Sequence, residues 1–176
     1  MASAVRLPVK PPPIVPHVRG PDESATSAYA RVPLDTDRLR DLRRQRKWSQ
    51  HALSVQVGVQ GAAAISAWER GLTVPRPNTL CRVADALGVK PVELLAVDGD
   101  DALALRELRV SRGKTLRDLA SAAQTSVSTV RRWENGDFVR MPAAHVVRSL
   151  AHALRESEAC VVSALKQARR VAQVRG

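Results

Sequence analysis

An internal repeat is the feature that most constrains how this chain folds. The copies share core, cap and turn residues at an offset of 66, in the pairs Leu39 and Leu105, Leu42 and Leu108, Arg43 and Arg109, Ser49 and Thr115, and Leu53 and Leu119. The motif Trp68, Glu69, Gly71 recurs at an offset of 65 as Trp133, Glu134, Gly136, so the first copy has one extra residue before its tryptophan. The 176 residues therefore predict two copies of one small fold.

Apolar residues in each copy recur at the three- to four-residue spacing of amphipathic helices. In the first copy, Asp35, Thr36 or Asp37 and then Ser49 and Asn78 are predicted helix caps. A helix over residues 61–71, ended by glycine, and a short helix beginning near Pro91 complete the pattern. No stretch alternates like a strand. The predicted fold class is all-α, with two tandem five-helix bundles.

Composition divides the chain into three parts. Residues 1–34 hold seven of the eleven prolines and predict a disordered Pro-rich leader. The copies then predict domains at residues 35–97 and 98–176, the second ending in an amphipathic helix with Val161, Leu165, Ala168 and Ala172 on one face. That helix is expected to cover the second bundle; a dimer contact is the alternative. The joint VDGDD spans at most about 17 Å, so the two domains must lie close together.

The net charge of +11 favours a polyanionic partner, and the surplus is shared as +2, +4 and +5 over residues 1–34, 35–97 and 98–176. Only five residues are aromatic, too few for the stacking platforms that bind single strands. Double-stranded DNA is therefore the expected partner. Whether the basic residues of the leader also lie along phosphates stays open.

Several function classes are not expected. Cys81 and Cys160 fit neither a disulfide framework nor a zinc spacing, and His145 and His152 lack a closing ligand, so packing is favoured over a metal site. We find no phosphate loop, catalytic carboxylate pair or nucleophile motif, and predict no enzyme, cofactor or small-molecule ligand. No apolar stretch is long enough for a membrane span. The expected location is the cytoplasm, on the nucleoid, and the excess of Arg over Lys, 23 to 5, favours a bacterial source.

Residues 39–59, LRDLRRQRKWSQHALSVQVGV, followed by ISAWERG, resemble the lambda-repressor-like helix-turn-helix family. The resemblance covers about residues 36–97, and more loosely 102–156. It implies a five-helix bundle whose third helix enters the major groove. It also implies that Gln50 steadies a helix N-terminus on a phosphate, and that Arg76 and its counterpart Arg140 contact phosphates.

The resemblance further implies two partly buried ion pairs, Arg43 with Glu69 and Arg109 with Glu134; two unrelated surface charges are the alternative in each case. The outward candidates of the first recognition helix are small residues with few base-discriminating groups: Gln60, Gly61, Ala62, Ala63, Ser66, Ala67 and Arg70. Those of the second helix include arginines, which pair with guanine: Ser126, Val127, Ser128, Arg131 and Arg132. Leu116 and Gln124 replace the family's glutamine and turn glycine, which puts the docking of this copy in question.

The favoured function is a sequence-specific transcriptional regulator, with repression the expected direction. One alternative keeps the DNA binding but serves plasmid or phage replication, transfer or partition. Another makes the Ala-rich first domain a protein-docking module. A homodimer stays open as a partner.

Overall fold

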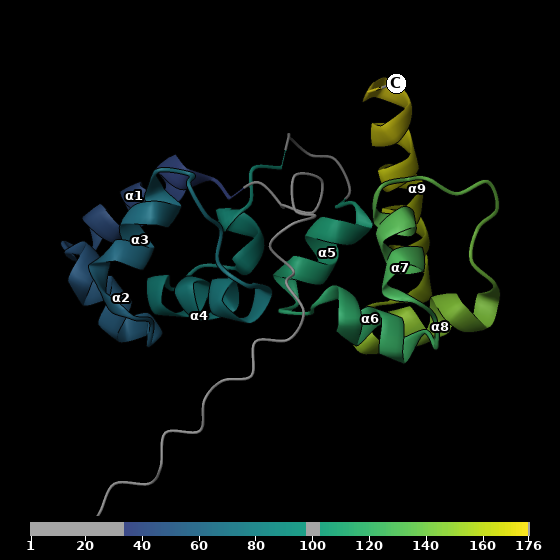
Figure 1. Cartoon of the computed structure of the whole chain (residues 1–176), viewed down its shortest axis with the longest axis horizontal. Coiled ribbons are helices and arrows are strands. Elements are labelled where there is room, and N and C mark those ends of the chain that lie inside the picture. Colours follow the sequence, from purple (N-terminus) through teal and green to yellow (C-terminus); the bar gives the residue numbers. More distant parts are fainter. Residues whose placement is uncertain (1–33, 98–102, 176) are drawn as a thin grey trace, which may run out of the picture.

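The computed structural model describes residues 34–97 and 103–175 (Figure 1). Within these ranges the chain is helical, apart from turns and one isolated antiparallel bridge between Leu34 and Leu95. The predicted all-α class with two tandem bundles is confirmed. The predicted leader, except Leu34, and most of the joint lie outside the described residues.

The first module follows the helix order that the periodicity predicts. Its elements are α1 (Thr36–Gln45), α2 (Gln50–Val57), α3 (Gly61–Glu69), α4 (Pro77–Leu87) and a short 3-10 helix, η2 (Pro91–Leu94). Asp35 caps α1 by accepting from the Arg38 amide, and Ser49 caps α2 by accepting from the Ala52 amide.

One cap in the first module was predicted wrongly. Asn78 lies inside α4, whose N-cap is Arg76 and whose first residue is Pro77. Proline fits the first helical position because its fixed φ suits the helix and the missing N–H would be unpaired there anyway. Asn78 instead accepts a hydrogen bond from the hydroxyl of Thr79 at 3.3 Å.

The second module repeats this order. Its elements are α5 (Leu105–Ser111), α6 (Leu116–Ala122), α7 (Val127–Glu134), α8 (Ala144–Leu154) and the long α9 (Glu158–Arg175). A Cβ on Gly136 would lie 2.5 Å from the Ala168 carbonyl oxygen of α9, so α9 packs directly over the end of α7. This packing agrees with the predicted cover of the second bundle by the C-terminal helix.

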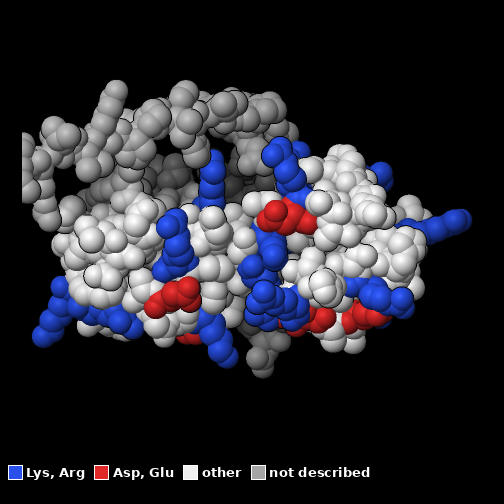
Figure 2. All heavy atoms as spheres, turned by 90° about the horizontal axis from the view of Figure 1, so that it is seen from below, with Lys and Arg blue, Asp and Glu red and all other residues white. Residues whose placement is uncertain are grey.

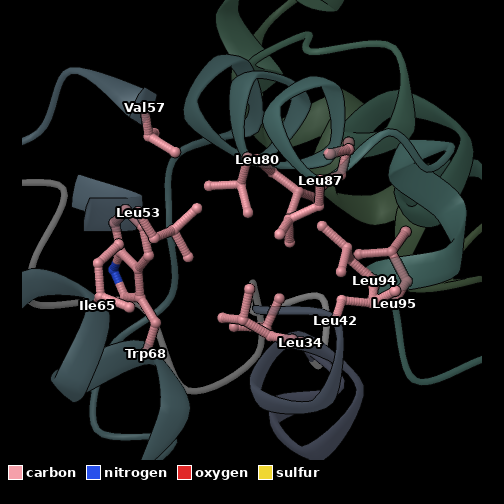
Figure 3. Packing of buried hydrophobic residues seen from close by; sticks show 14 residues of the cluster. Leu34, Leu42, Leu53, Val57, Ile65, Trp68, Leu80, Leu87, Leu94 and Leu95 are labelled. Carbon is pink, nitrogen blue, oxygen red and sulfur yellow. The ribbon is translucent and has the colours of Figure 1, made fainter. Parts of the chain in front are cut away.

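In the first core, Trp68 and Ile65 of α3 lie beside Leu53 of α2 (Figure 3). Its buried members are Leu34, Leu39, Leu42, Leu53, Val57, Ile65, Trp68, Leu80, Val83, Ala84, Leu87, Leu94, Leu95 and, from the second module, Val110. The backbone N–H of Asp35 donates to the Leu94 carbonyl at 2.9 Å, which ties the start of this module to its end.

The second core uses equivalent positions and adds α9. Its buried members are Leu105, Leu108, Leu119, Ala120, Ala123, Val130, Val147, Leu150, Ala151, Leu154, Val161, Ala164 and Leu165. The two modules are in contact, because α5 packs against both α4 and η2 of the first module (Figure 1).

Candidate nucleic-acid interface

In the first module, α2 and α3 pack against each other across a short turn. Gly58 ends α2 in the left-handed conformation, with φ of 69°, which glycine adopts without steric cost. Leu53, Val57 and Ile65 bury the inner faces of the two helices. The outer face of α3 is therefore held on a fixed two-helix frame.

In the second module, α6 and α7 form the same arrangement. Gln124 replaces the turn glycine yet keeps its left-handed backbone, with φ of 49°. The Ser126 hydroxyl caps α7 by accepting from the Thr129 amide at 3.0 Å. The substitution of the turn glycine therefore changes the energy of this turn but not its conformation.

The extra residue of the first copy lies at the start of its recognition helix. Gln60 is the N-cap of α3 but makes no side-chain capping bond, and Gly61 has a φ of 70° with open space around its missing Cβ. The insertion is thus absorbed by a left-handed glycine, and the two recognition helices begin differently.

A buried ion pair joins α1 to the end of α3. Arg43 donates from Nε and from a terminal nitrogen to the two carboxylate oxygens of Glu69, at 2.6 and 3.0 Å, and donates to the Trp48 carbonyl at 2.7 Å. Burial alone would raise the pKa of Glu69. Hydrogen bonds from Arg43 and Gln50, with the charges of Arg43 and Arg40, outweigh burial and hold that pKa below its usual value.

The second module repeats this pair. Arg109 donates to both carboxylate oxygens of Glu134 at 2.5 and 3.1 Å, and to the Lys114 carbonyl at 2.9 Å. Leu116 occupies the position of Gln50 and packs against the core, while Arg106 Nε lies 3.7 Å from Glu134. Arg106 is the counterpart of Arg40, which donates to the Glu69 carbonyl at 2.7 Å, so both modules place a second arginine near the glutamate, and only the first adds a glutamine hydrogen bond.

The glutamine of the first module is held within the protein. Gln50 Nε2 donates to Glu69 Oε2 at 2.9 Å, at the N-terminus of α2. Its amide group is thereby held at Glu69, while the N-terminus of α2 is a place where a phosphate would be attracted. Contact between Gln50 and a phosphate stays a prediction.

The residues predicted to face DNA in the first module lie on or beside α3, and Arg76 among them was predicted to contact a phosphate. Gln60, Gly61, Ala63, Arg70 and Arg76 are exposed, whereas Ala62, Ser66 and Ala67 are half-buried. No side chain on the outward face of α3 itself presents a bidentate donor or acceptor; Gln60 precedes the helix, and Arg70 and Arg76 follow it. This surface can contact a thymine methyl but has little to distinguish bases by hydrogen bonding.

The predicted base-facing residues of the second module are more polar. Ser126, Val127, Ser128 and Arg132 are exposed, and the Ser126 and Ser128 hydroxyls lie 2.7 Å apart. Arg140, which was predicted as a phosphate contact, is also exposed, but it is not the structural counterpart of Arg76: Arg76 is the N-cap of α4, and the N-cap of α8 is Ala143.

The two arginines of α7 differ. Arg131 is half-buried, and its Nε has no hydrogen-bond partner in the described part of the chain. Arg132 is exposed and lies 3.2 Å from Asp137, which the sequence analysis did not single out. A positive residue followed five positions later by an acid, across a helix end, is the signal that was missed.

Basic side chains occur along both modules. On the face drawn in Figure 2, lysine and arginine are spread over the length of the molecule with acidic side chains between them. This distribution matches the charge surplus that the sequence assigns to both copies. Attraction to a polyanion is therefore shared by the modules.

The histidines and cysteines that the sequence analysis considered as metal ligands do not come together in the described part of the chain. His145 and His152 are exposed, and residues 34–97 and 103–175 hold no group of three or more His, Cys, Asp or Glu side chains placed for a metal. Burial raises the pKa of both cysteine thiols. The negative charge of Asp85 raises the pKa of Cys81 further, and Glu156 does the same for Cys160. No described helix is both long and apolar enough to cross a membrane.

Comparison with protein-family models gives two matches. Residues 36–97 match a family described as a helix-turn-helix domain, and residues 105–159 match a second family described as helix-turn-helix. The chain is a tandem helix-turn-helix protein. Both modules are of the lambda-repressor-like type, as the sequence predicted. Neither the curated proteins nor the solved structures yielded a match.

Membership of this family indicates which helices of the two modules would contact DNA. Helix-turn-helix domains bind double-stranded DNA, with the second helix of the motif in the major groove. In this protein those helices are α3 and α7, each anchored through its terminal glutamate to a buried arginine.

Proposed function

We propose that this tandem helix-turn-helix protein is a bacterial transcriptional regulator that uses both modules to bind one duplex site and represses by occupying a promoter. One observation carries the proposal: the two recognition helices differ in their outward side chains, although the two modules hold them in the same way. Both α3 and α7 end in a glutamate paired with a buried arginine, but only α7 carries arginines within the helix. Affinity would come from both modules, and most sequence discrimination from α7.

Binding of the full chain to duplex DNA at several salt concentrations tests the proposal. Affinity should fall steeply, with a log–log slope of about −0.9 for each phosphate neutralised. Arg76→Ala and Arg140→Ala should weaken binding to all sequences alike and make the slope shallower. Equal affinity for duplex DNA at low and high salt would reject the proposal.

A second hypothesis, in which the first module docks a protein, is favoured by the small side chains of α3. Two matched substitutions separate the hypotheses in the full chain: Ala63→Asp on α3 and Ser128→Asp on α7, both at exposed positions. An added carboxylate repels phosphates wherever a helix enters DNA. Loss of affinity in both variants supports DNA binding by both modules, whereas loss only in Ser128→Asp supports docking by the first.

Repression and a role in replication, transfer or partition differ in where the protein binds. Mapping of bound sites in the source genome would place them at promoters in the first case, and at an origin or partition site in the second.

A further inference from the structure

Helix α5 belongs to the second module but also completes the core of the first. Val110 retains only 7% of its exposure and packs among the first module's buried residues, through the contacts of α5 with α4 and η2. A valine at this depth removes apolar surface from water only while the modules stay docked.

A second contact lies at the turn that follows α5. The Cys81 thiol of α4 lies 3.7 Å from the Ser111 carbonyl oxygen, in donor geometry. Gly113 has a φ of 67°, and a Cβ there would lie 3.2 Å from Cys81 Sγ and 3.7 Å from Asn78 Cα. The turn therefore approaches α4 closely at a point where a longer side chain would have to displace its neighbours.

The repeat supplies an internal control for this contact. The counterpart of Val110 in the first module is Arg44, that of Gly113 is Lys47, and the α8 counterpart of Cys81 is Arg148. All three counterparts are exposed and charged. Lys47 keeps the same left-handed backbone as Gly113, with φ of 56°, so this turn does not itself require glycine. The positions that contact the other module therefore hold small or apolar residues. The equivalent positions of the repeat, which contact no other module in the described part of the chain, hold long cationic side chains.

The packing joins unlike surfaces. The first module contributes α4, and the second contributes α5, the equivalent of α1. A two-fold arrangement would use the same patch on both copies and would pack α1 against α8 equally closely, which the described residues do not. The two recognition helices are consequently not related by a two-fold axis.

We propose that the two modules form one rigid DNA-binding body, and that its partner is a composite duplex site whose two half-sites have a fixed spacing and are not an inverted repeat. This inference rests on the proposed function for its DNA partner, but the rigidity can be tested without DNA.

The first experiment measures distances between spin labels in the free protein. Labels at Val55→Cys in the first module and Ser163→Cys in the second use two exposed positions, in a background with Cys81→Ser and Cys160→Ser. The expected result is one narrow distance distribution. In the same background, Gly113→Lys should broaden it, whereas Val139→Lys, the same change of charge at a residue that is 85% exposed, should not.

The second experiment uses a DNA site selected with the intact chain. Inserting about 5 base pairs, half a helical turn, between the half-sites turns one of them to the opposite side of the duplex. Wild-type affinity should then fall by about 100-fold, because a rigid body can no longer engage both halves. Gly113→Lys should bind the original site more weakly than Val139→Lys does, and should lose little more on insertion.

The outcomes separate the two proposals. A broad distance distribution in the labelled protein without Gly113→Lys, or one that Gly113→Lys leaves unchanged in a folded variant, would overturn the rigid body. Narrow distances with binding that is indifferent to insertion would overturn the composite site. Narrow distances without any duplex binding would instead contradict the proposed function. If Gly113→Lys fails to fold, as judged by its helical circular dichroism, Cys81→Arg, made in place of Cys81→Ser, opens the same contact from the other side.

Discussion

At the scale of single residues, the two arginine–glutamate pairs are buried charges that each need their partner. Each glutamate is buried at the end of a recognition helix and accepts two hydrogen bonds from one guanidinium group. Removing one partner of a buried pair leaves the other charge uncompensated, which costs more than an exposed pair contributes. The pairs should therefore support the fold before they affect sequence preference.

We expect Glu69→Gln to lower the stability of the first module by about 3–5 kcal/mol, because Arg43 stays buried without its counter-ion. For a domain of this size that corresponds to a fall in Tm of roughly 10 °C or more. Asp41→Asn, at an exposed carboxylate of the same module, is the control and should leave Tm nearly unchanged. Thermal melting at pH 7 checks the difference, and equal melting of the two variants would contradict it.

The same pair makes stability depend on pH. The pKa of Glu69 is lowered in the folded protein, so its stabilisation is present above the unfolded pKa of about 4.3 and is lost as the pH falls through the folded value. The Tm gap between wild type and Glu69→Gln should therefore be widest near pH 7 and narrow in acid. If the difference in Tm between the two proteins stays constant down to about pH 3, the loss of stability in Glu69→Gln comes from packing and not from the charge of Glu69.

At the scale of elements, the two helix-turn-helix motifs solve the same turn with different residues. Gly58 and Gln124 both have left-handed backbones between the two helices of the motif. For a residue with a Cβ this conformation costs about 1–2 kcal/mol, whereas glycine has only its unfolded-chain entropy to lose.

Gln124→Gly should accordingly stabilise the second module by about 1 kcal/mol, and the reciprocal Gly58→Gln should destabilise the first by a similar amount. Space does not oppose the second change, since the nearest atom to a Cβ at Gly58 is a terminal nitrogen of Arg82, 3.5 Å away. Chemical denaturation of the two variants measures both effects. Shifts of the same sign would show that backbone strain does not govern these turns.

The end of α7 carries the other prediction at this scale. Exposed Asp137 lies beside Arg132 and adds a negative charge next to a candidate DNA-facing residue. Such a pair contributes little stability, so Asp137→Asn should free Arg132 and raise affinity for all duplexes a few-fold, with Tm unchanged. Glu158→Gln, which opens the exposed Arg148–Glu158 pair on another part of the module, is the control. If the two variants bind duplex DNA with equal affinity, Asp137 does not lie at the DNA interface.

Most elements were predictable from sequence, since apolar spacing, Ser and Thr caps and left-handed glycines are local signals. Local signals were insufficient at Asn78. This residue type often caps helices, but here the helix begins one residue earlier, at Pro77. They also missed the charge of Arg106 beside Glu134, because the family resemblance marked only Arg109 as the partner of that glutamate. In the candidate site, residue types could be predicted, but the half-burial of Arg131 depends on how α7 sits in its bundle.

At the scale of the whole molecule, the docking of the modules was not predicted, although the repeat contains its signal. The short joint indicates only that the modules are close. Aligning the copies shows Arg44, Lys47 and Arg148 matched by Val110, Gly113 and Cys81, and the loss of three cations on one continuous surface indicates a buried contact. This signal acquires its meaning only when the fold places α4 beside α5.

Unequal recognition helices in one body predict an unequal site. The preferred sequence of the intact chain should be non-palindromic, with the half beneath α7 more stringent, because Arg132 can grip a guanine and the Ala-rich face of α3 cannot. Arg132→Ala should relax preference in that half by about 1–3 kcal/mol and leave the other half unchanged. Arg140→Ala, an exposed arginine of the same module outside α7, should weaken binding without altering preference. Selection of sites from random duplexes, followed by footprinting, provides the measurement. A palindrome that is protected only by a dimer and is indifferent to Arg132 would show that a single module of each chain recognises the DNA.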